Sequence, residues 1–239
     1  MKNPIRMLTY NIRSGLGMDN KRSLSKIASV IESSGADLIG LQETDKYMIS
    51  SCFSFQAKKL AQLLGMNYAF GGAWKPIFFS SFGNTILSKY PIIEYKNTLL
   101  PGAGEQRALL EAVADINNCR IRLCNTHLGL SQATREEQVD KIIELLGDFS
   151  LPTILIGDCN VTPDDPIIDK LSACFRQKSS IFTDENTIDE HKTYPSNNPT
   201  EKLDYIFFSS HWKEISQKIL PSQASDHLPL LAEGKLAYS

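Results

Sequence analysis

Polar side chains of the types that bind metal ions and phosphate stand at the ends of apolar runs, or interrupt them, along this chain. Burying a carboxylate or an imidazole without a partner costs several kcal/mol, so these residues are expected to meet one another in the fold. A cluster of carboxylates, amides and two histidines would form a site for a divalent cation and a phosphate group. The residues are Asn11, Glu43, His127, Asp158, Asn160, Asp204, Asp226 and His227.

The segment Gly157-Asp158-Cys159-Asn160 follows a short, wholly apolar run. In an extended backbone Asp158 and Asn160 point to one side and Cys159 to the other. A carboxylate able to orient water or a metal ion would then face the same cavity as an amide able to donate to phosphate oxygen. The alternative is a simple turn, because Asp and Asn near Gly and Pro are common turn residues. Cys159 is expected to be a core-packed thiol.

Glu43 ends the apolar run LIGLQ, and Asn11 follows the run LTY. A carboxylate at a strand end is a natural ligand for Mg²⁺, which needs only one or two protein carboxylates and keeps several waters. The alternative for each residue is a solvated polar group at the end of a strand.

Two histidines and an acidic residue extend this pattern. Asp226-His227 precedes an apolar run and places an imidazole at a strand start, where it can titrate near neutral pH. Asp204 lies inside the run LDYIFF and needs a partner, for which an imidazole N–H is the simplest choice. His127 follows IRLCNT and can donate to a phosphate oxygen. A single histidine in a strand is usually structural, but two of them among acid-bearing strand ends favour a site.

The elements that must position these residues follow from apolar periodicity. Strands are expected at 8–10, 37–42, 67–70, 85–88, 92–98, 107–116, 119–126, 152–157, 203–208 and 228–232. Helices are expected over 21–34, 53–64 and about 135–146, with Thr134 and Glu137 in capping-box spacing, and a further helix start at 162–165 with Pro163 first. Hairpins mixed with strand–helix units predict one mixed α/β domain over residues 1–239.

Composition narrows the class of protein. The chain has 239 residues, 42% of them apolar and 22% charged, and a net charge of −2, so nothing attracts it globally to polyanions. Its five cysteines form no CxxC pair and are expected to be reduced thiols. The N-terminus lacks the apolar region of a signal peptide and no run is long enough to span a bilayer, which predicts a cytoplasmic protein without a transmembrane segment. A leaderless secretion route stays open.

Seven segments in order resemble the endonuclease/exonuclease/phosphatase superfamily, which includes deoxyribonuclease I-like enzymes, abasic-site endonucleases, inositol polyphosphate 5-phosphatases and neutral sphingomyelinases. The resemblance covers residues 7–231. It implies a four-layer α/β sandwich, in which two facing mixed sheets carry helices on their outer faces. The segments are TYNIRSG, DLIGLQETD, GNTILSKYPI, NTHLG, GDCNVTP, KLDYIFFS and SDHLPL.

The resemblance also implies a metal and its ligands. Glu43 looks like the principal ligand of Mg²⁺ or Mn²⁺, with Asn11 beside it and Asp226 contributing. The activity it implies is metal-assisted hydrolysis of a phosphate ester by in-line attack of water. Whether one metal or two take part stays open.

Catalytic roles carry over in the same way. Asp158 and Asn160 resemble the pair that positions the attacking water and holds the phosphate, while Asp204 resembles the acid that orients His227. His227 resembles a general base or a phosphate-polarising imidazole, and the choice between Asp158 and His227 as base stays open. His127 resembles the second histidine of the deoxyribonuclease-like and phosphatase-like branches, whereas abasic endonucleases usually have a tyrosine segment there. Between the residues that match Asp158 and Asn160 the family commonly has an aromatic residue, whereas this chain has Cys159.

Arg107 follows the glycine-rich PGAGEQ and is predicted to contact the substrate phosphate, since an arginine fork matches phosphate geometry. The alternative is an ion-paired or surface arginine. The irregular segments 71–82 and 182–200 are candidate functional loops, and specificity is expected to come chiefly from the segments 71–82 and 102–107. The first has several aromatics and one lysine, which favours a base or an apolar group over a long phosphate backbone. Its aromatics are Trp74, Phe78, Phe79 and Phe82, and its lysine is Lys75.

The expected function is therefore a phosphodiesterase or phosphatase acting, as a monomer, on a small molecule, a lipid head group or single-stranded nucleic acid. Alternatives are a nuclease acting on DNA or RNA, and a non-catalytic binding protein on the same fold. A cysteine-based hydrolase using Cys124 or Cys159 is disfavoured, because both thiols fall in or directly beside predicted strands and a nucleophilic thiol must be accessible.

Overall fold

The computed structural model describes residues 3–74, 79–147, 149–175 and 191–237. One sheet has the strand order β11-β12-β1-β2-β5-β4, with β3 joined to β2, and the other has the order β10-β9-β8-β7-β6. The first sheet contains β1 (Ile5–Asn11), β2 (Leu38–Met48), β3 (Ser54–Phe55), β4 (Asn67–Trp74), β5 (Ser81–Ser88), β11 (Trp212–Ile219) and β12 (Leu230–Leu236). The second contains β6 (Ile92–Leu99), β7 (Ala108–Ile116), β8 (Cys119–His127), β9 (Thr153–Asp158) and β10 (Asp204–Phe208).

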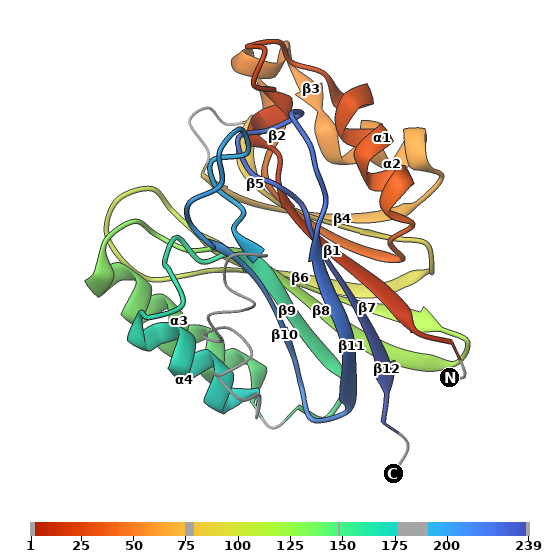
Figure 1. Ribbon diagram of the computed structural model, residues 1–239, viewed down its shortest axis with the longest axis vertical. Coiled ribbons are helices and arrows are strands. Elements are labelled where there is room, and N and C mark those ends of the chain that lie inside the picture. Colours follow the sequence, from red (N-terminus) through yellow and green to blue (C-terminus); the bar gives the residue numbers. More distant parts are fainter. Residues whose placement is uncertain (1–2, 75–78, 148, 176–190, 238–239) are drawn as a thin grey trace.

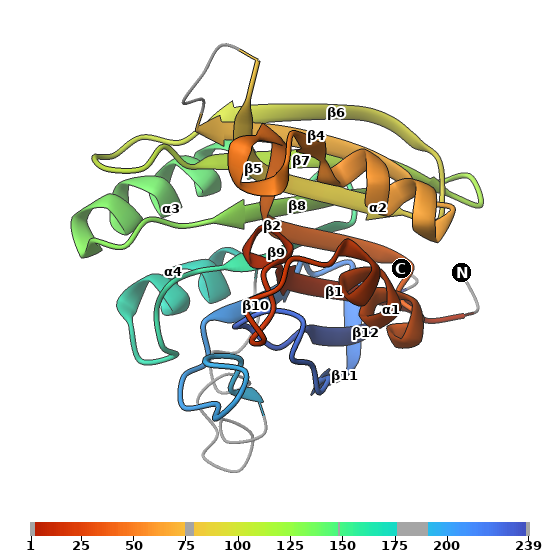
Figure 2. The ribbon, with the colours of Figure 1, turned by 90° about the horizontal axis from the view of Figure 1, so that it is seen from above.

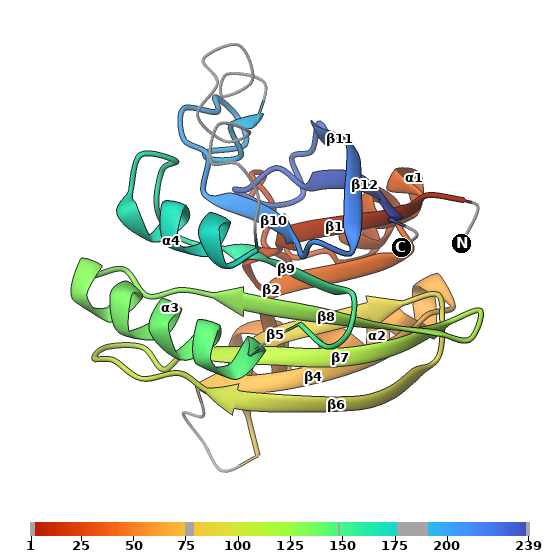
Figure 3. The ribbon, with the colours of Figure 1, turned by 90° about the horizontal axis from the view of Figure 1, so that it is seen from below.

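The helices cover the two outer faces of the sheets. They are α1 (Leu24–Ser34), α2 (Gln56–Leu64), α3 (Gln132–Leu146) and α4 (Pro166–Cys174), with 3₁₀ turns η1 (Arg13–Gly15) and η2 (Ile49–Ser51). Helices α1 and α2 lie over the first sheet, and α3 and α4 over the second (Figure 1). The views from above and below keep the two helix pairs on opposite sides (Figure 2, Figure 3). Among the described residues, no helix has the length and apolar character needed to cross a lipid bilayer.

Three apolar clusters fill the spaces between these layers. One lies between the sheets and includes Met7, Leu110 and Ile156. The other two lie outside the sheets, one joining Val139 of α3 to the second sheet and one joining Ile27 of α1 to the first. The molecule is therefore helix, sheet, sheet, helix in cross-section, and the predicted four-layer α/β sandwich is confirmed.

The first two helices end as predicted, before Gly35 and Gly65, but each begins three residues later than predicted, at Leu24 and Gln56. Ser23 is the N-cap of α1 and its side chain accepts a hydrogen bond from the backbone N–H of Lys26. Gly35 and Gly65 close α1 and α2 with left-handed φ values of 66° and 63°, a conformation that a glycine adopts without steric cost.

The starts of the other two helices differ from prediction. Helix α3 begins a turn early, because Ser131 caps it by accepting from the backbone N–H of Thr134, and Thr134 itself is buried inside the helix. Helix α4 begins at Pro166 with Asp165 as its N-cap, so Pro163 lies before the helix. In both cases two residues of a type that favours the N-cap lie three positions apart in the sequence. Tertiary packing determines which of the two caps the helix.

Some strands differ as well. Strands β3 and β11 were not predicted; β11 is an edge strand with a largely polar sequence, so it lacks the apolar alternation of a half-buried strand. The segment 71–82 is largely the hairpin of β4 and β5 rather than an irregular loop. Its residues 75–78, with Lys75 and Phe78, and residues 182–190 of the other predicted loop lie outside the described residues.

Strand pairing brings the chemical residues to one edge of the sandwich. In the parallel pair β8–β9, His127 stands opposite Asp158, and in the antiparallel pair β9–β10, Asp158 stands opposite Asp204. In the other sheet, β1 and β2 run parallel, with Asn11 opposite Gln42. Because parallel strands end at the same edge, residues from both sheets meet there.

Candidate active site

Asp158, the last residue of β9, is the centre of the site and is 1% exposed. Its Oδ1 accepts a 2.9 Å hydrogen bond from the backbone N–H of Asn160, and its Oδ2 accepts a 3.0 Å bond from Asn11 Nδ2. The Nε2 atoms of His127 and His227 lie 3.5 and 3.6 Å from the same Oδ2. One buried carboxylate therefore faces two imidazoles.

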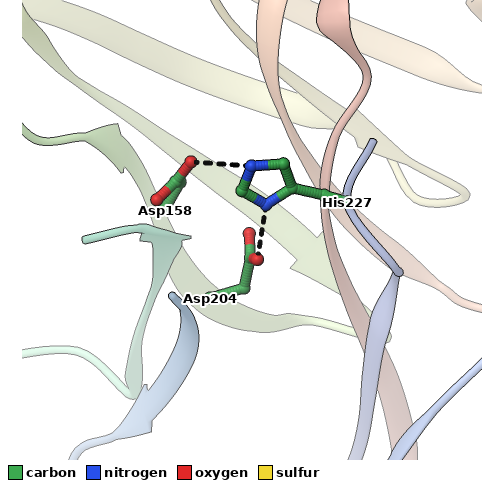
Figure 4. A group of neighbouring side chains, drawn as sticks. All are labelled: Asp158, Asp204 and His227. Atoms are coloured by element: carbon green, nitrogen blue, oxygen red, sulfur yellow. Dashed lines mark hydrogen bonds and ion pairs between the residues drawn. The ribbon is translucent and has the colours of Figure 1, made fainter. Parts of the chain in front are cut away.

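The first imidazole belongs to a histidine–aspartate pair. His227 Nδ1 lies 2.9 Å from Asp204 Oδ2, and its other nitrogen points to Asp158 (Figure 4). Burial by itself lowers the pKa of His227, but the negative charges of Asp204, Asp158 and Asp226 outweigh burial and raise the pKa to about 10. His227 is therefore a cation at neutral pH, as the predicted pairing with Asp204 implies.

The second imidazole has the opposite neighbour. Arg107 Nη1 lies 3.1 Å from His127 Nδ1, and the same Nη1 lies 2.9 Å from Glu105 Oε1. Because a guanidinium group only donates, His127 Nδ1 must accept, and the ring proton is then on Nε2, toward Asp158. Burial and the positive charge of Arg107 lower the pKa of His127 to about 3, although Asp158 opposes them. His127 is thus neutral at neutral pH.

Arg107 was predicted to contact the substrate phosphate. It is 8% exposed and contacts His127 and Glu105, so the ion-paired alternative describes its position in the structure. Its Nε has no hydrogen-bond partner within the described part of the chain. Direct contact of Arg107 with phosphate stays a prediction.

Glu43 does not end its strand. Strand β2 continues to Met48, and Glu43 lies at a bulge where the register with β5 shifts and its φ is 56°. The second half of β2 is polar and is held in the sheet by pairing with β5 and β3. It lacks an apolar run, so the sequence pattern ends the strand too early. Glu43 Oε1 accepts a 3.0 Å hydrogen bond from Asn11 Nδ2, which also bonds Asp158. Burial, Asp158 and Asp226 raise the pKa of Glu43.

Asp226 reaches the site from the chain segment before β12. Its Oδ2 lies 3.3 Å from Arg13 Nε, and its Oδ1 accepts a 3.2 Å hydrogen bond from Ser225 Oγ. Arg13 lies two residues after Asn11 and was not predicted; apart from its place in TYNIRSG, the sequence carries no signal for it.

The prediction of an extended backbone through Asn160 is wrong. Asn160 has a left-handed φ of 54°, its backbone N–H bonds Asp158, and its Nδ2 donates to the carbonyl oxygen of Leu128 at 2.8 Å. The turn alternative is therefore correct for the backbone, and the side chain joins the loops after β8 and β9. Cys159 is 2% exposed and packs in the core beneath α3 and α4, as predicted.

A buried amide network that the sequence analysis did not identify lies below the site. Gln42 Nε2 donates to Asn125 Oδ1 at 2.7 Å and to Thr9 Oγ1 at 3.1 Å. Asn125 Nδ2 donates to the carbonyl oxygens of Leu41 and Thr85 at 2.9 Å. The network ties the two sheets together under the site. Its sequence signal is the same one that marked the site itself, an amide interrupting an apolar run.

Gln138 is a second residue that the sequence analysis missed. It is 1% exposed in α3, accepts from the backbone N–H of Gly129 at 2.8 Å and donates to the carbonyl oxygen of Pro101 at 3.1 Å. These contacts fix the loops beside His127 and Arg107. Nothing in the sequence distinguishes Gln138 from other polar residues of a helix.

The buried cysteines do not form a nucleophilic centre. Cys124 and Cys159 are almost fully buried, and burial raises the pKa of both thiols. A protonated thiol is a poor nucleophile, so the cysteine-hydrolase alternative remains disfavoured.

The chain belongs to the endonuclease/exonuclease/phosphatase family, whose model matches residues 8–227. An uncharacterized protein of Escherichia coli, YbhP, is 27% identical over 254 aligned positions that cover 95% of each chain. A family member from Bacteroides vulgatus has a TM-score of 0.78 at 19% identity, covering 99% of this chain and 100% of that one. A mannosyl-6-phosphatase of Bacteroides thetaiotaomicron has a TM-score of 0.72 at 18% identity, covering 97% and 100%. These solved structures share the fold.

Proposed function

We propose that this protein is a divalent-metal-dependent phosphoesterase that cleaves its substrate by in-line attack of water. The observation that carries the proposal is the buried carboxylate of Asp158, flanked by a cationic and a neutral imidazole next to the acidic group of Glu43. Membership of a family of nucleases and phosphatases supports it, as does a phosphatase among the structural neighbours.

Glu43 is the proposed principal ligand of Mg²⁺ or Mn²⁺, with Asn11 and Asp226 beside it. These residues offer hard oxygen atoms, the type that both ions prefer. The pKa of Glu43 is raised by burial and then by the carboxylates of Asp158 and Asp226, so three acidic groups crowd one region. A bound divalent cation would relieve that repulsion, and this makes the residues a good fit for such an ion. When bound, the ion would stabilise negative charge on the phosphoryl and leaving oxygens.

A second grouping fits a metal less well. Ligand-type atoms of Asp158, Asp204 and His227 lie within 4.8 Å of one another. However, the hydrogen bond of His227 Nδ1 to Asp204, together with the protonation of this ring, leaves the imidazole no lone pair for a cation and places a positive charge in the group. We therefore assign these three residues to proton and phosphate chemistry.

Asp158 is the proposed general base. A histidine with a pKa near 10 is already protonated at neutral pH and cannot accept the proton of the attacking water. His227 would instead stabilise a phosphoryl oxygen as a cation held in place by Asp204. His127 would donate a hydrogen bond from its Nε2–H group to another phosphoryl oxygen. Asn160 would complete the phosphate site after a rotation of its amide away from Leu128.

The proposed substrate is a small or single-stranded phosphate ester rather than duplex DNA. Trp74 and Phe79 of the β4–β5 hairpin are 43% and 57% exposed, which supports stacking or apolar contact with a substrate. The net charge of −2 gives no general attraction to a long polyanion.

Hydrolysis of bis-p-nitrophenyl phosphate and p-nitrophenyl phosphate, with Mg²⁺ or Mn²⁺ and with EDTA as control, tests the reaction. We expect turnover that EDTA abolishes and that Asp158→Asn reduces at least about 100-fold. Turnover that survives EDTA would contradict the metal role, and no turnover of any phosphate ester would support the non-catalytic alternative. Efficient cleavage of duplex plasmid at about 150 mM salt, with little activity on small esters or oligonucleotides, would contradict the substrate class.

A further inference from the structure

A cavity of about 660 Å³, which none of the catalytic residues lines, lies between the beginning of α1 and one side of α2, from Gln56 to Leu63. The residues around it come from η1, η2 and the two helices. Ser14 connects it to the catalytic edge, since residue 14 lines the cavity and the preceding Arg13 pairs with Asp226. The cavity and the catalytic centre thus share one turn of backbone.

Both helices direct their amino ends toward this cavity. Helix α1 connects the parallel strands β1 and β2, so it runs back from the carboxyl end of β1. Helix α2 precedes β4, which runs parallel to β2 because both are antiparallel to β5. Consequently α1 and α2 begin at the same end of the sheet and lie side by side (Figure 1). The N–H groups and the positive dipole ends of two helices there favour an anion.

The side chains around the cavity carry positive charge. Arg22 and Lys59 line it, and no carboxylate does so within the described residues. Arg22 Nη1 donates to the carbonyl oxygen of Ser14 at 2.8 Å, which holds the guanidinium group against the shared turn. Lys59 has no ion-pair partner in the part of the chain that the structure describes. Helix α2 also lacks a side-chain hydrogen bond at its N-cap, Phe55.

A buried hydroxyl group at the cavity independently indicates a ligand. Ser54 is 7% exposed and lines the cavity, yet its Oγ has no hydrogen-bond partner among the described residues. Buried polar groups in folded proteins almost always have a partner. The hydroxyl oxygen is itself buried, so a rotation of the Ser54 side chain toward the cavity would let a bound molecule supply that partner.

We propose that this cavity is a second anion-binding site, which takes a small organic molecule carrying a phosphate group. Arg22, Lys59 and the two helix ends would bind the phosphate, and Ser54 Oγ would donate to it after rotating toward the cavity. The cavity is larger than an inorganic phosphate ion needs, and Leu24 and Leu63 offer apolar contact to an organic part. The proposal does not depend on the catalytic reaction, because none of these residues belongs to the catalytic set.

The test is a titration of the metal-free protein, in EDTA, with inorganic phosphate and with phenylphosphonate, followed by backbone amide NMR. We expect saturable shifts in residues 23–26 and 54–57, with phenylphosphonate binding more tightly than phosphate. Arg22→Gln/Lys59→Gln should weaken binding at this site at least about tenfold, because it removes two charge-assisted contacts. Ser54→Ala should weaken it about threefold or more.

The matched control is Lys58→Gln/Lys213→Gln, which removes the same charge from exposed positions of α2 and β11 that do not line the cavity. It should leave the affinity within about twofold, since exposed charges at a distance are screened. Shifts confined to residues near His127 and Asp158, or shifts at the helix ends that persist unchanged in the Arg22/Lys59 variant, would overturn the proposal. Unchanged amide spectra elsewhere show that the variants are folded.

Discussion

The two histidines of the site lie in nearly matched positions and differ in charge. His127 and His227 are each 6% exposed, and their Nε2 atoms lie 3.5 and 3.6 Å from the same oxygen of Asp158. Their pKa values are nevertheless displaced in opposite directions, to about 3 and about 10. Burial lowers the pKa of both rings and is the largest cause for His127, where the positive charge of Arg107 adds to it against the opposing charge of Asp158. For His227 the charges of Asp204, Asp158 and Asp226 and the hydrogen bond to Asp204 outweigh burial.

This difference gives one carboxylate two kinds of neighbour. His227 presents a fixed positive charge and His127 presents a neutral N–H donor. A phosphate group entering between them would meet a cation on one side and a polarising donor on the other. Asp158 stays available as a base because neither imidazole competes with it for the proton of water.

The largest expected effect is the loss of kcat when the cationic pair of His227 and Asp204 is changed. Asp204→Asn and His227→Ala should each lower kcat at least about 100-fold, and the double variant should lose little more, because the two residues act as one unit. Steady-state kinetics on a p-nitrophenyl ester would measure all three variants. Additive losses in the double variant would mean that Asp204 does not act through His227.

A change beside the neutral His127 should lower kcat less and should also change the pKa of that histidine. Arg107→Gln should lower kcat about tenfold or more and raise the pKa of His127, since a repulsive positive charge and the donor to Nδ1 are both removed. NMR titration of the histidine ring measures the pKa. Arg120→Gln, at an exposed position near the start of β8, is the control and should change neither quantity. An unchanged pKa of His127 in Arg107→Gln would contradict the claim that Arg107 helps to keep this histidine neutral.

The proposed metal ligands form a third region, to which neither histidine belongs. Glu43→Gln should keep the fold and weaken Mn²⁺ binding about tenfold or more, because a neutral amide is a poorer ligand for a hard cation. Titration calorimetry with Mn²⁺ measures this. Mn²⁺ affinity in Glu43→Gln equal to that of the unmodified protein would remove Glu43 from the metal role.

The smallest effects are on stability, and the two histidines should give opposite signs. His127 has a folded-state pKa below its unfolded value, so its contribution is present above about pH 6.5 and is lost as pH falls toward 3, by up to about 1.4 kcal/mol per pH unit. His227 has a raised pKa, so its contribution is complete below about pH 6.5 and is lost as pH rises toward 10.

Urea unfolding of the metal-free protein across this pH range, compared with His127→Asn and His227→Asn, measures both contributions. The stability difference from His127→Asn should grow as pH rises from 3 to 6.5, whereas the difference from His227→Asn should shrink as pH rises from 6.5 to 10. Stability differences that change with pH in the same direction in both variants would contradict the opposed pKa shifts.

Apolar periodicity predicts most of the helices and strands, and the family resemblance implies their four layers. Most residues of the candidate site can be found from sequence because they are polar groups that interrupt apolar runs. Asp158 and His227 stand out for that reason, and so does Gln42 once the structure reveals its partner. Features set by tertiary contacts are not predictable in this way. The bulge at Glu43 and the left-handed turn at Asn160 depend on backbone pairing and on distant carbonyl groups, which leave no local pattern.

The difference in charge between His127 and His227 could be predicted only in part. Asp204 could be paired with a histidine from sequence, since a buried carboxylate needs a donor. The approach of Arg107 to His127 could not be predicted, because an arginine after a glycine-rich loop is equally suited to phosphate, solvent or an ion pair. The contact exists because the β7–β8 pairing brings the start of β7 beside the end of β8.

Long-range ¹H–¹⁵N NMR of the histidine rings in the metal-free protein at pH 7 tests the central claim most directly. The structure predicts an imidazolium pattern for His227, with both ring nitrogens protonated, and a neutral pattern for His127 with the proton on Nε2. Two rings in the same charge state, or a His127 proton on Nδ1, would contradict the assignment of opposite roles to the two histidines.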